Sequence, residues 1–104
     1  MFVDVQVSCA DREEAARIAD LLVTGRLAAC VHLSPIESRY EWRGEQVADD
    51  EVLLRALTRS ERFDDLVRVV TDAHSYEVPA IVATELAGAS APYLRWLGEQ
   101  IDPA

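Results

Sequence analysis

Residues 26–58 read RLAACVHLSPIESRYEWRGEQVADDEVLLRALT, and this stretch decides the fold. A short apolar run is interrupted by Pro35, after which an alternating pattern continues to Arg43-Gly44-Glu45, a turn signal. Beyond the turn the alternation resumes, with apolar Val52, Leu54 and Ala56 on one face. Two alternating segments that flank a tight turn predict one long, bent β-hairpin.

The segment before the hairpin predicts a strand followed by a helix. In residues 2–9, FVDVQVSC, every second residue is apolar, which is the period of a half-buried strand. Asp11 with Glu14 forms a capping-box pattern, apolar residues then recur at helical spacing, and Gly25 is a natural stop. We therefore expect a helix over about residues 11–24.

The segment after the hairpin predicts a second helix. Thr58 with Glu61, or Ser60 alone, is expected to cap its start. An apolar stripe follows at helical spacing and is expected to face the core. The stripe consists of Phe63, Leu66, Val67, Val70 and Ala73.

The last third of the chain predicts a strand and a short terminal helix. EVPAIVATEL, residues 77–86, resembles a short buried strand, and Pro79 belongs at its start or on a sheet edge because proline cannot donate a ladder hydrogen bond. Ser90 and Pro92 mark the start of the helix. Its core side is expected to hold Tyr93, Leu94, Leu97 and Ile101, with Trp96 packed nearby.

This order of elements predicts an α+β fold within a single domain over residues 1–104. Two strand–helix–strand units pack as a ferredoxin-like β-α-β-β-α-β sandwich, in which two helices cover one face of a four-stranded antiparallel sheet. The other face would be bare, and the extended hairpin is too long for the other strands to pair. Both features predict self-association.

Composition excludes several classes of function. The net charge is −9, and the ten basic residues are all arginines without a basic run, which argues against nucleic-acid binding. The longest apolar stretches are far shorter than the roughly 20 residues that span a bilayer, so no membrane insertion is expected. The N-terminal MFVDVQV lacks a signal-peptide pattern, so we expect a cytoplasmic protein with reduced cysteines.

Four motifs together resemble one family. ARIADLLVTGRLAACVHLSPIESRYEWRGE, EVLLRALTRSERF, HSYEVPAIVA and YLRWL occur in this order and cover most of the chain. Together they resemble the CutA family, the divalent-cation tolerance proteins. The resemblance implies a homotrimer of ferredoxin-like subunits, similar to PII signalling proteins, and a link to tolerance of copper and other divalent metals. It implies no enzymatic activity and no organic cofactor.

The resemblance also implies metal ligands. The family's cysteine at the end of the first strand, the cysteine of its AAC segment and the histidine of its His-Pro-Tyr box match Cys9, Cys30 and His74. Cysteine and histidine suit copper or zinc. Alternatively, both cysteines pack as small hydrophobic residues, and an imidazolium at His74 caps the second helix. If either thiol is reactive, Cys9 is expected to be the one, since it precedes a helix N-terminus.

Three positions depart from the family pattern. Leu57, Ser75 and Ala80 stand where the family has lysine, proline and glutamate. A lysine and a glutamate that could have faced each other are both apolar here. Any function that depends on them, such as anion binding in a cleft between subunits, is then not expected.

Other polar and aromatic residues suggest an interface or a cleft. Tyr40 and Trp42 alternate on the hairpin and are expected to contact a neighbouring subunit. Tyr76 and Glu77 are expected to form a polar corner with His74. The acidic residues 49–51 predict a solvated turn, with weak binding of hard cations as the alternative.

Two alternatives to metal tolerance remain in other functional classes. The first is a PII-like regulatory trimer that binds a small metabolite or a protein partner at the cleft between subunits. The second is a small enzyme on the same fold, such as an acylphosphatase. The enzyme is disfavoured because SCADREEA, in the first strand–helix loop, is acidic and lacks a glycine-rich turn for phosphate.

Overall fold

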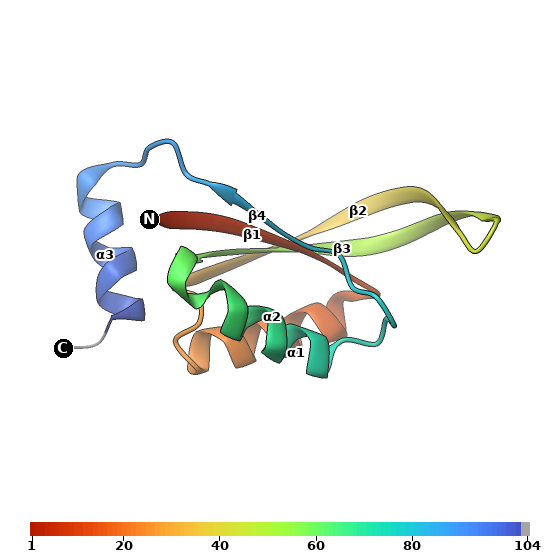
Figure 1. The fold of residues 1–104 in the computed structure, drawn as a ribbon, viewed down its shortest axis with the longest axis horizontal. Coiled ribbons are helices and arrows are strands. Elements are labelled where there is room, and N and C mark those ends of the chain that lie inside the picture. The colour runs from red at the N-terminus through yellow and green to blue at the C-terminus, as the bar shows by residue number, and fades with distance from the viewer. Residues whose placement is uncertain (103–104) are drawn as a thin grey trace.

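The computed structural model describes residues 1–102. The elements run in the order β1 (Phe2–Cys9), α1 (Arg12–Thr24), β2 (Cys30–Trp42), β3 (Glu45–Arg59), a 3₁₀ turn (Ser60–Arg62), α2 (Phe63–Ala73), β4 (Ile81–Glu85) and α3 (Ala91–Ile101). The four strands form one antiparallel sheet in the order β2-β3-β1-β4, with α1 and α2 side by side on one face (Figure 1). The predicted α+β, ferredoxin-like arrangement is confirmed.

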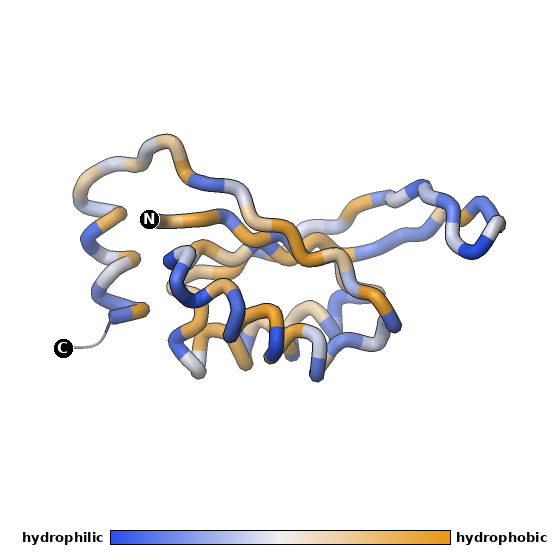
Figure 2. Tube along the Cα trace, viewed as in Figure 1, coloured by the Kyte–Doolittle hydropathy of each residue, from blue (hydrophilic) through white to orange (hydrophobic). Residues whose placement is uncertain are grey.

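The hairpin is the longest part of the structure. β2 and β3 pair without interruption from Cys30 opposite Leu57 to Trp42 opposite Glu45. Arg43 and Gly44 close it with positive φ angles of 50° and 84°, as a two-residue turn of primed type requires. The arm extends well beyond the helices and is mostly hydrophilic at its tip (Figures 1 and 2). Residues 49–51 belong to β3, so the prediction of a solvated turn there was wrong.

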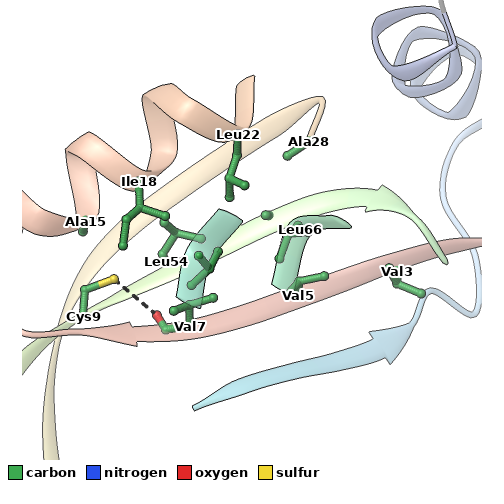
Figure 3. Close-up of a cluster of buried hydrophobic side chains, with 12 residues drawn as sticks. Val3, Val5, Val7, Cys9, Ala15, Ile18, Leu22, Ala28, Leu54 and Leu66 are labelled. Atoms are coloured by element: carbon green, nitrogen blue, oxygen red, sulfur yellow. Dashed lines mark hydrogen bonds between the residues drawn. The ribbon is translucent and has the colours of Figure 1, made fainter. Parts of the chain in front are cut away.

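The hydrophobic core lies between the sheet and the two helices α1 and α2 (Figure 3). The alternating valines of β1 and the apolar stripes of the two helices supply most of it, as their spacing predicted, except that Val69 packs against the core where Val67 was expected. Leu54 lies at its centre and is completely buried. The fully buried residues of this core are Val5, Val7, Cys9, Ala15, Ile18, Leu22, Leu54, Ala56, Leu66 and Val70.

Helix α3 packs over one end of the opposite face of the sheet. Leu97 and Ile101 are fully buried there against the partly buried Phe2 and Leu57. Trp96, by contrast, is 40% exposed and stacks on exposed Tyr93, so the expectation that both pack into the core was wrong for a single chain. No helix within residues 1–102 is long and apolar enough to cross a membrane.

The start of α2 differs from the prediction. Thr58 lies within β3 and is buried, and the Ser60 hydroxyl donates to the Glu61 carboxylate rather than accepting from the helix. A 3₁₀ turn precedes the helix instead, and the first α-helical turn has no side-chain cap. The turn carries the chain over from the end of β3 without a separate loop.

Strand β4 is also more exposed than its sequence suggested. Ile81 packs against the core, but the other four residues of the strand are exposed, and Val82 is 61% exposed. Successive side chains of a strand point to opposite faces, so Val82 lies on the face that α1 and α2 leave open. The expectation of a buried strand therefore fails for a single chain.

Candidate functional site

The end of β1, the start of α1 and the end of α2 meet at a polar corner formed by Cys9, Glu14 and His74. One ligand atom from each residue lies within 4.8 Å of the other two. The Cys9 and His74 side chains are fully buried, and Glu14 is 4% exposed. Two of the three predicted metal ligands therefore lie together, with a carboxylate between strand and helices.

The Glu14 carboxylate connects the elements of the polar corner through hydrogen bonds. Its Oε2 accepts a hydrogen bond from the Ala10 amide at 2.8 Å, and its Oε1 accepts one from the Ser75 amide at 2.7 Å. Burial raises the pKa of this carboxyl, but the hydrogen bonds from Ala10 and Ser75 outweigh burial and hold the pKa below its ordinary value of 4.5. Glu14 thus connects the start of α1 to the segment that follows α2.

His74 has both ring nitrogens engaged. Its Nδ1 accepts from the Tyr76 amide at 3.1 Å, so the ring proton is assigned to Nε2, which donates to the Ser8 carbonyl at 2.7 Å. Both ring nitrogens are therefore committed to backbone groups in this arrangement. His74 is the C-cap residue of α2, as expected, but its ring is anchored to the Ser8 carbonyl of β1 instead of to the carbonyls of α2.

Cys9 is a poor nucleophile in this corner. Its thiol is fully buried and directed at the Val7 carbonyl, 4.0 Å away (Figure 3). Burial, followed by the negative charges of Glu14, Glu51 and Asp11, raises the pKa of the thiol to about 12. The expectation that Cys9 is the reactive thiol was wrong, because thiolate is the reactive form.

Cys30 lies elsewhere on the sheet. It pairs with Leu57, whereas Cys9 pairs with Val52 of the same strand, so the two cysteines are five residue steps, roughly 17 Å, apart along the sheet at about 3.3 Å per residue. Its Sγ lies 3.6 Å from Nε2 of His32. Within a single chain, Cys30 therefore cannot share an ion with Cys9 and His74.

Glu14 is the candidate ligand that sequence reasoning missed. The sequence assigned it only to the cap of α1, where the Glu14 amide does donate to Asp11 Oδ1 at 2.8 Å. In the usual capping box the glutamate reaches back to the amide of the cap residue itself, but here it reaches Ala10. A glutamate one turn after a strand that ends in cysteine is the signal that could have identified it.

The polar corner has the donor types for a soft divalent ion. Thiolate, imidazole and carboxylate are all zinc ligands, and such an ion binds them at about 2.0–2.3 Å. The Nδ1 of His74 and the Oε1 of Glu14 are 4.0 Å apart, so a bound ion would draw them closer. It would also displace the thiol proton of Cys9 and the Tyr76 amide from Nδ1. The three residues are therefore suitable metal ligands. An ion would have to compete with the hydrogen bonds that they now form.

A groove of about 470 Å³ adjoins the polar corner, between the hairpin and the segment that precedes β4. It brings together all four residues that the sequence suggested for a cleft or an interface, including Tyr40 and Trp42 from β2. Its full lining is Ser8, Ser38, Arg39, Tyr40, Trp42, Glu51, Tyr76, Glu77, Val78 and Ala80. The His74 and Tyr76 rings, with centroids 4.7 Å apart, connect the corner to the groove.

Hydrogen bonds and an ion pair organise the groove. The Tyr76 hydroxyl donates to Oε2 of Glu51 at 2.5 Å. The Tyr40 hydroxyl likewise donates to a carboxylate of β3, Oδ2 of Asp49, at 2.8 Å. Glu77 forms an exposed ion pair with Arg43 at 2.6 Å, which ties the hairpin turn to the segment before β4.

The three departures from the family pattern lie in different places. Ser75 supplies the amide that Glu14 accepts, Ala80 lines the groove, and Leu57 packs beneath α3. Leu57 and Ala80 therefore do not face each other within one chain. We expected that the family's lysine and glutamate at these two positions could face each other. Within a single chain this expectation is wrong.

Comparisons with known proteins agree with the fold. The model of the family described as CutA1 divalent ion tolerance protein matches residues 3–100. The divalent-cation tolerance protein CutA of Thermus thermophilus is 43% identical over 96 residues, which cover 91% of this chain and 93% of that protein. The chain spans only 52% of the chloroplastic CutA protein of Arabidopsis thaliana and 62% of the CutA homologue of Xenopus laevis, each 40% identical.

Solved structures give the same result. The periplasmic divalent cation tolerance protein CutA of Archaeoglobus fulgidus superposes with a TM-score of 0.96 at 34% identity, over 98% of this chain and all of that one. CutA1 of Oryza sativa superposes with a TM-score of 0.94 at 35% identity, over 99% and 95% of the two chains. Family model, relatives and fold agree along nearly the whole sequence, and the chain belongs to the CutA1 divalent ion tolerance family.

Proposed function

We propose that this chain contributes to tolerance of divalent cations as a homotrimer that binds copper or zinc at the polar corner. The observation that carries the metal proposal is the convergence of Cys9, Glu14 and His74, from three separate elements, within 4.8 Å. The net charge of −9 supports it in general terms, since an acidic surface attracts cations. No catalytic role is part of the proposal.

The open face of the sheet and the projecting hairpin support the trimer. Exposed Val82 and the ion pair between Asp4 and Arg55 lie on the face that α1 and α2 leave open. A large uncovered sheet face and an arm without packing partners are typical of subunits that bury both on assembly. Sedimentation equilibrium is expected to give three times the 11.6 kDa of one chain. The mass of a single chain at micromolar concentration would contradict it.

The metal proposal predicts which cysteine matters. Titration of the protein with Zn²⁺ in a calorimeter is expected to show saturable binding that Cys9→Ser weakens at least about tenfold, because a thiolate ligand is lost. His74→Ala is expected to weaken binding similarly. Binding also releases the Cys9 proton, so the measured heat should vary with the ionisation enthalpy of the buffer.

Cys30→Ser is the matched control, because it removes the same group far from the polar corner. It is expected to leave Zn²⁺ affinity unchanged. If Cys30→Ser weakens binding as much as Cys9→Ser, both cysteines contribute to the ion's ligands. One chain does not bring these two cysteines together, so the proposed site at the polar corner would be wrong. If the unaltered protein shows no saturable binding, metal binding itself is refuted.

We place the protein in the cytosol as part of this proposal. Both cysteines are free, and a reducing compartment keeps thiols in that form. The matched relatives include one named chloroplastic and one named periplasmic, so the family is not confined to one compartment. Reduced thiols are also the form in which Cys9 could bind a metal.

A second candidate function is a PII-like regulatory trimer that binds a small molecule. The specific observation in its favour is the groove, whose volume of about 470 Å³ suits a small ligand. Its lining is supplied by three parts of the chain that are far apart in sequence: Ser8 of β1, the hairpin and the segment 76–80. A ligand there would tie the arm to the body of the subunit.

A further inference from the structure

The groove contains an uncompensated negative charge. Two carboxylates line it, and Glu77 is paired with Arg43. Glu51 is 6% exposed, and among residues 1–102 it has no ion-pair partner, since its hydrogen bond comes from the neutral hydroxyl of Tyr76. A carboxylate that is nearly buried without a cation destabilises the fold, and a cation bound beside it would offset that cost.

The arginine that lines the groove does not supply this cation. Arg39 pairs with Glu37 at 2.5 Å, and both side chains are largely exposed. Arg43, the other arginine nearby, is engaged by Glu77 and lies 5.3 Å from the Trp42 ring centroid. Both charges are therefore balanced within the chain, and the charge of Glu51 remains.

The walls of the groove are aromatic. Tyr40, Trp42 and Tyr76 all line it, and aromatic faces attract cations; the Trp42 ring already has the Arg43 guanidinium 5.3 Å from its centroid. Nearby carboxylates strengthen this field. The Tyr40 hydroxyl donates to Asp49 and the Tyr76 hydroxyl donates to Glu51, so both hydroxyls are directed at carboxylates of β3.

We propose that the groove binds an alkylated ammonium ion, with the aromatic rings around its alkyl groups and Glu51 as its counter-charge. This inference rests on the second candidate function, that the groove is a ligand site, and it specifies the chemical class of the ligand. A phosphate or carboxylate ligand would instead face Glu51 with no free cation in the lining.

A matched pair of probes tests the inference. Choline carries a trimethylammonium group, and 3,3-dimethyl-1-butanol has the same shape without the charge. Trp42 fluorescence reports binding once the other tryptophan is removed by Trp96→Phe, which keeps an aromatic ring against Tyr93. Choline is expected to produce a saturable change at least about tenfold lower in concentration than the alcohol, because cation–π attraction and charge pairing act only on choline.

Glu51→Gln separates charge from shape. Its amide oxygen can still accept from the Tyr76 hydroxyl, so the groove keeps its form while the negative charge is lost. The preference for choline over the alcohol is expected to fall to within about twofold. Asp65→Asn is the matched control, since it removes one negative charge from an exposed ion pair on α2 and should leave the preference intact.

The outcomes separate two claims: that the groove binds a ligand, and that this ligand is an alkylated ammonium ion. If neither probe changes Trp42 fluorescence saturably, the groove is not a ligand site, and both the second candidate function and this inference fail. If both probes bind equally, the groove remains a ligand site but does not recognise charge, and only this inference is overturned. Equal losses in Glu51→Gln and Asp65→Asn would also overturn it.

Discussion

Leu54→Ala is expected to lower the free energy of unfolding by about 3–5 kcal/mol. Leu54 lies on β3 at the centre of the core and is completely buried among β1, α1 and α2. Its removal loses buried apolar surface and leaves a cavity that rigid neighbours fill only in part. Domains of this size have total stabilities of only about 5–15 kcal/mol, so the loss is a large share of the total.

Urea denaturation followed by circular dichroism measures this change. Leu21→Ala is the matched control, because it removes the same atoms from a side chain of α1 that is 46% exposed. The control is expected to cost less than about 1 kcal/mol. All proteins should be compared at one concentration, since assembly adds to apparent stability. Equal losses in the two variants would contradict the position of Leu54 in the core.

Glu14→Ala is expected to cost about 2–4 kcal/mol, an unusually large effect for the loss of a glutamate. The substitution leaves the amides of half-buried Ala10 and of Ser75 without their acceptor, and an amide that loses its acceptor costs about 1–3 kcal/mol when it is shielded from water. Glu13→Ala is the control, because the neighbouring side chain is exposed in the same helical turn. Chemical denaturation of both variants at neutral pH tests the prediction, and similar losses in the two would refute the bridging role of Glu14.

The same carboxylate predicts a dependence on pH. Because the folded protein holds the pKa of Glu14 below its ordinary 4.5, folding favours the ionised form. The resulting stabilisation is fully present above pH 4.5 and is lost as the pH falls through the folded pKa. Glu14→Gln cannot ionise, so its stability deficit relative to the unaltered protein should be largest near neutral pH and shrink below pH 4.5. A constant deficit from pH 7 to pH 3 would contradict this mechanism.

The sequence was sufficient to predict the fold because its local signals agreed with one another. Alternation marked the hairpin and β1, and helical spacing marked α1 and α2 within a few residues of their observed bounds. The errors arose where tertiary contacts override local preference. Ser60 looks like a helix cap, but the chain enters α2 through a 3₁₀ turn. The apolar β4 looks buried, but it lies at a sheet edge.

The candidate site was predicted only in part. Family resemblance identified Cys9 and His74, which the structure brings together, but it also grouped them with Cys30. The sequence does not reveal the register of the strands, that is, which residues of neighbouring strands lie opposite each other. The observed register separates the two cysteines along the sheet. Glu14 was assigned to a helix cap because its second role depends on Ser75, which is 61 residues away in sequence.

The long hairpin has a consequence for the order in which the chain folds. Its first pair, Trp42 with Glu45, closes a two-residue turn, and each further pair adds to an existing ladder at little additional loop entropy. The pairs between β1 and β3, by contrast, join the two halves of the chain and require a large loop to close. An isolated two-stranded hairpin is only marginally stable in water. The arm can therefore form early and transiently, and it persists only once β1 docks against β3.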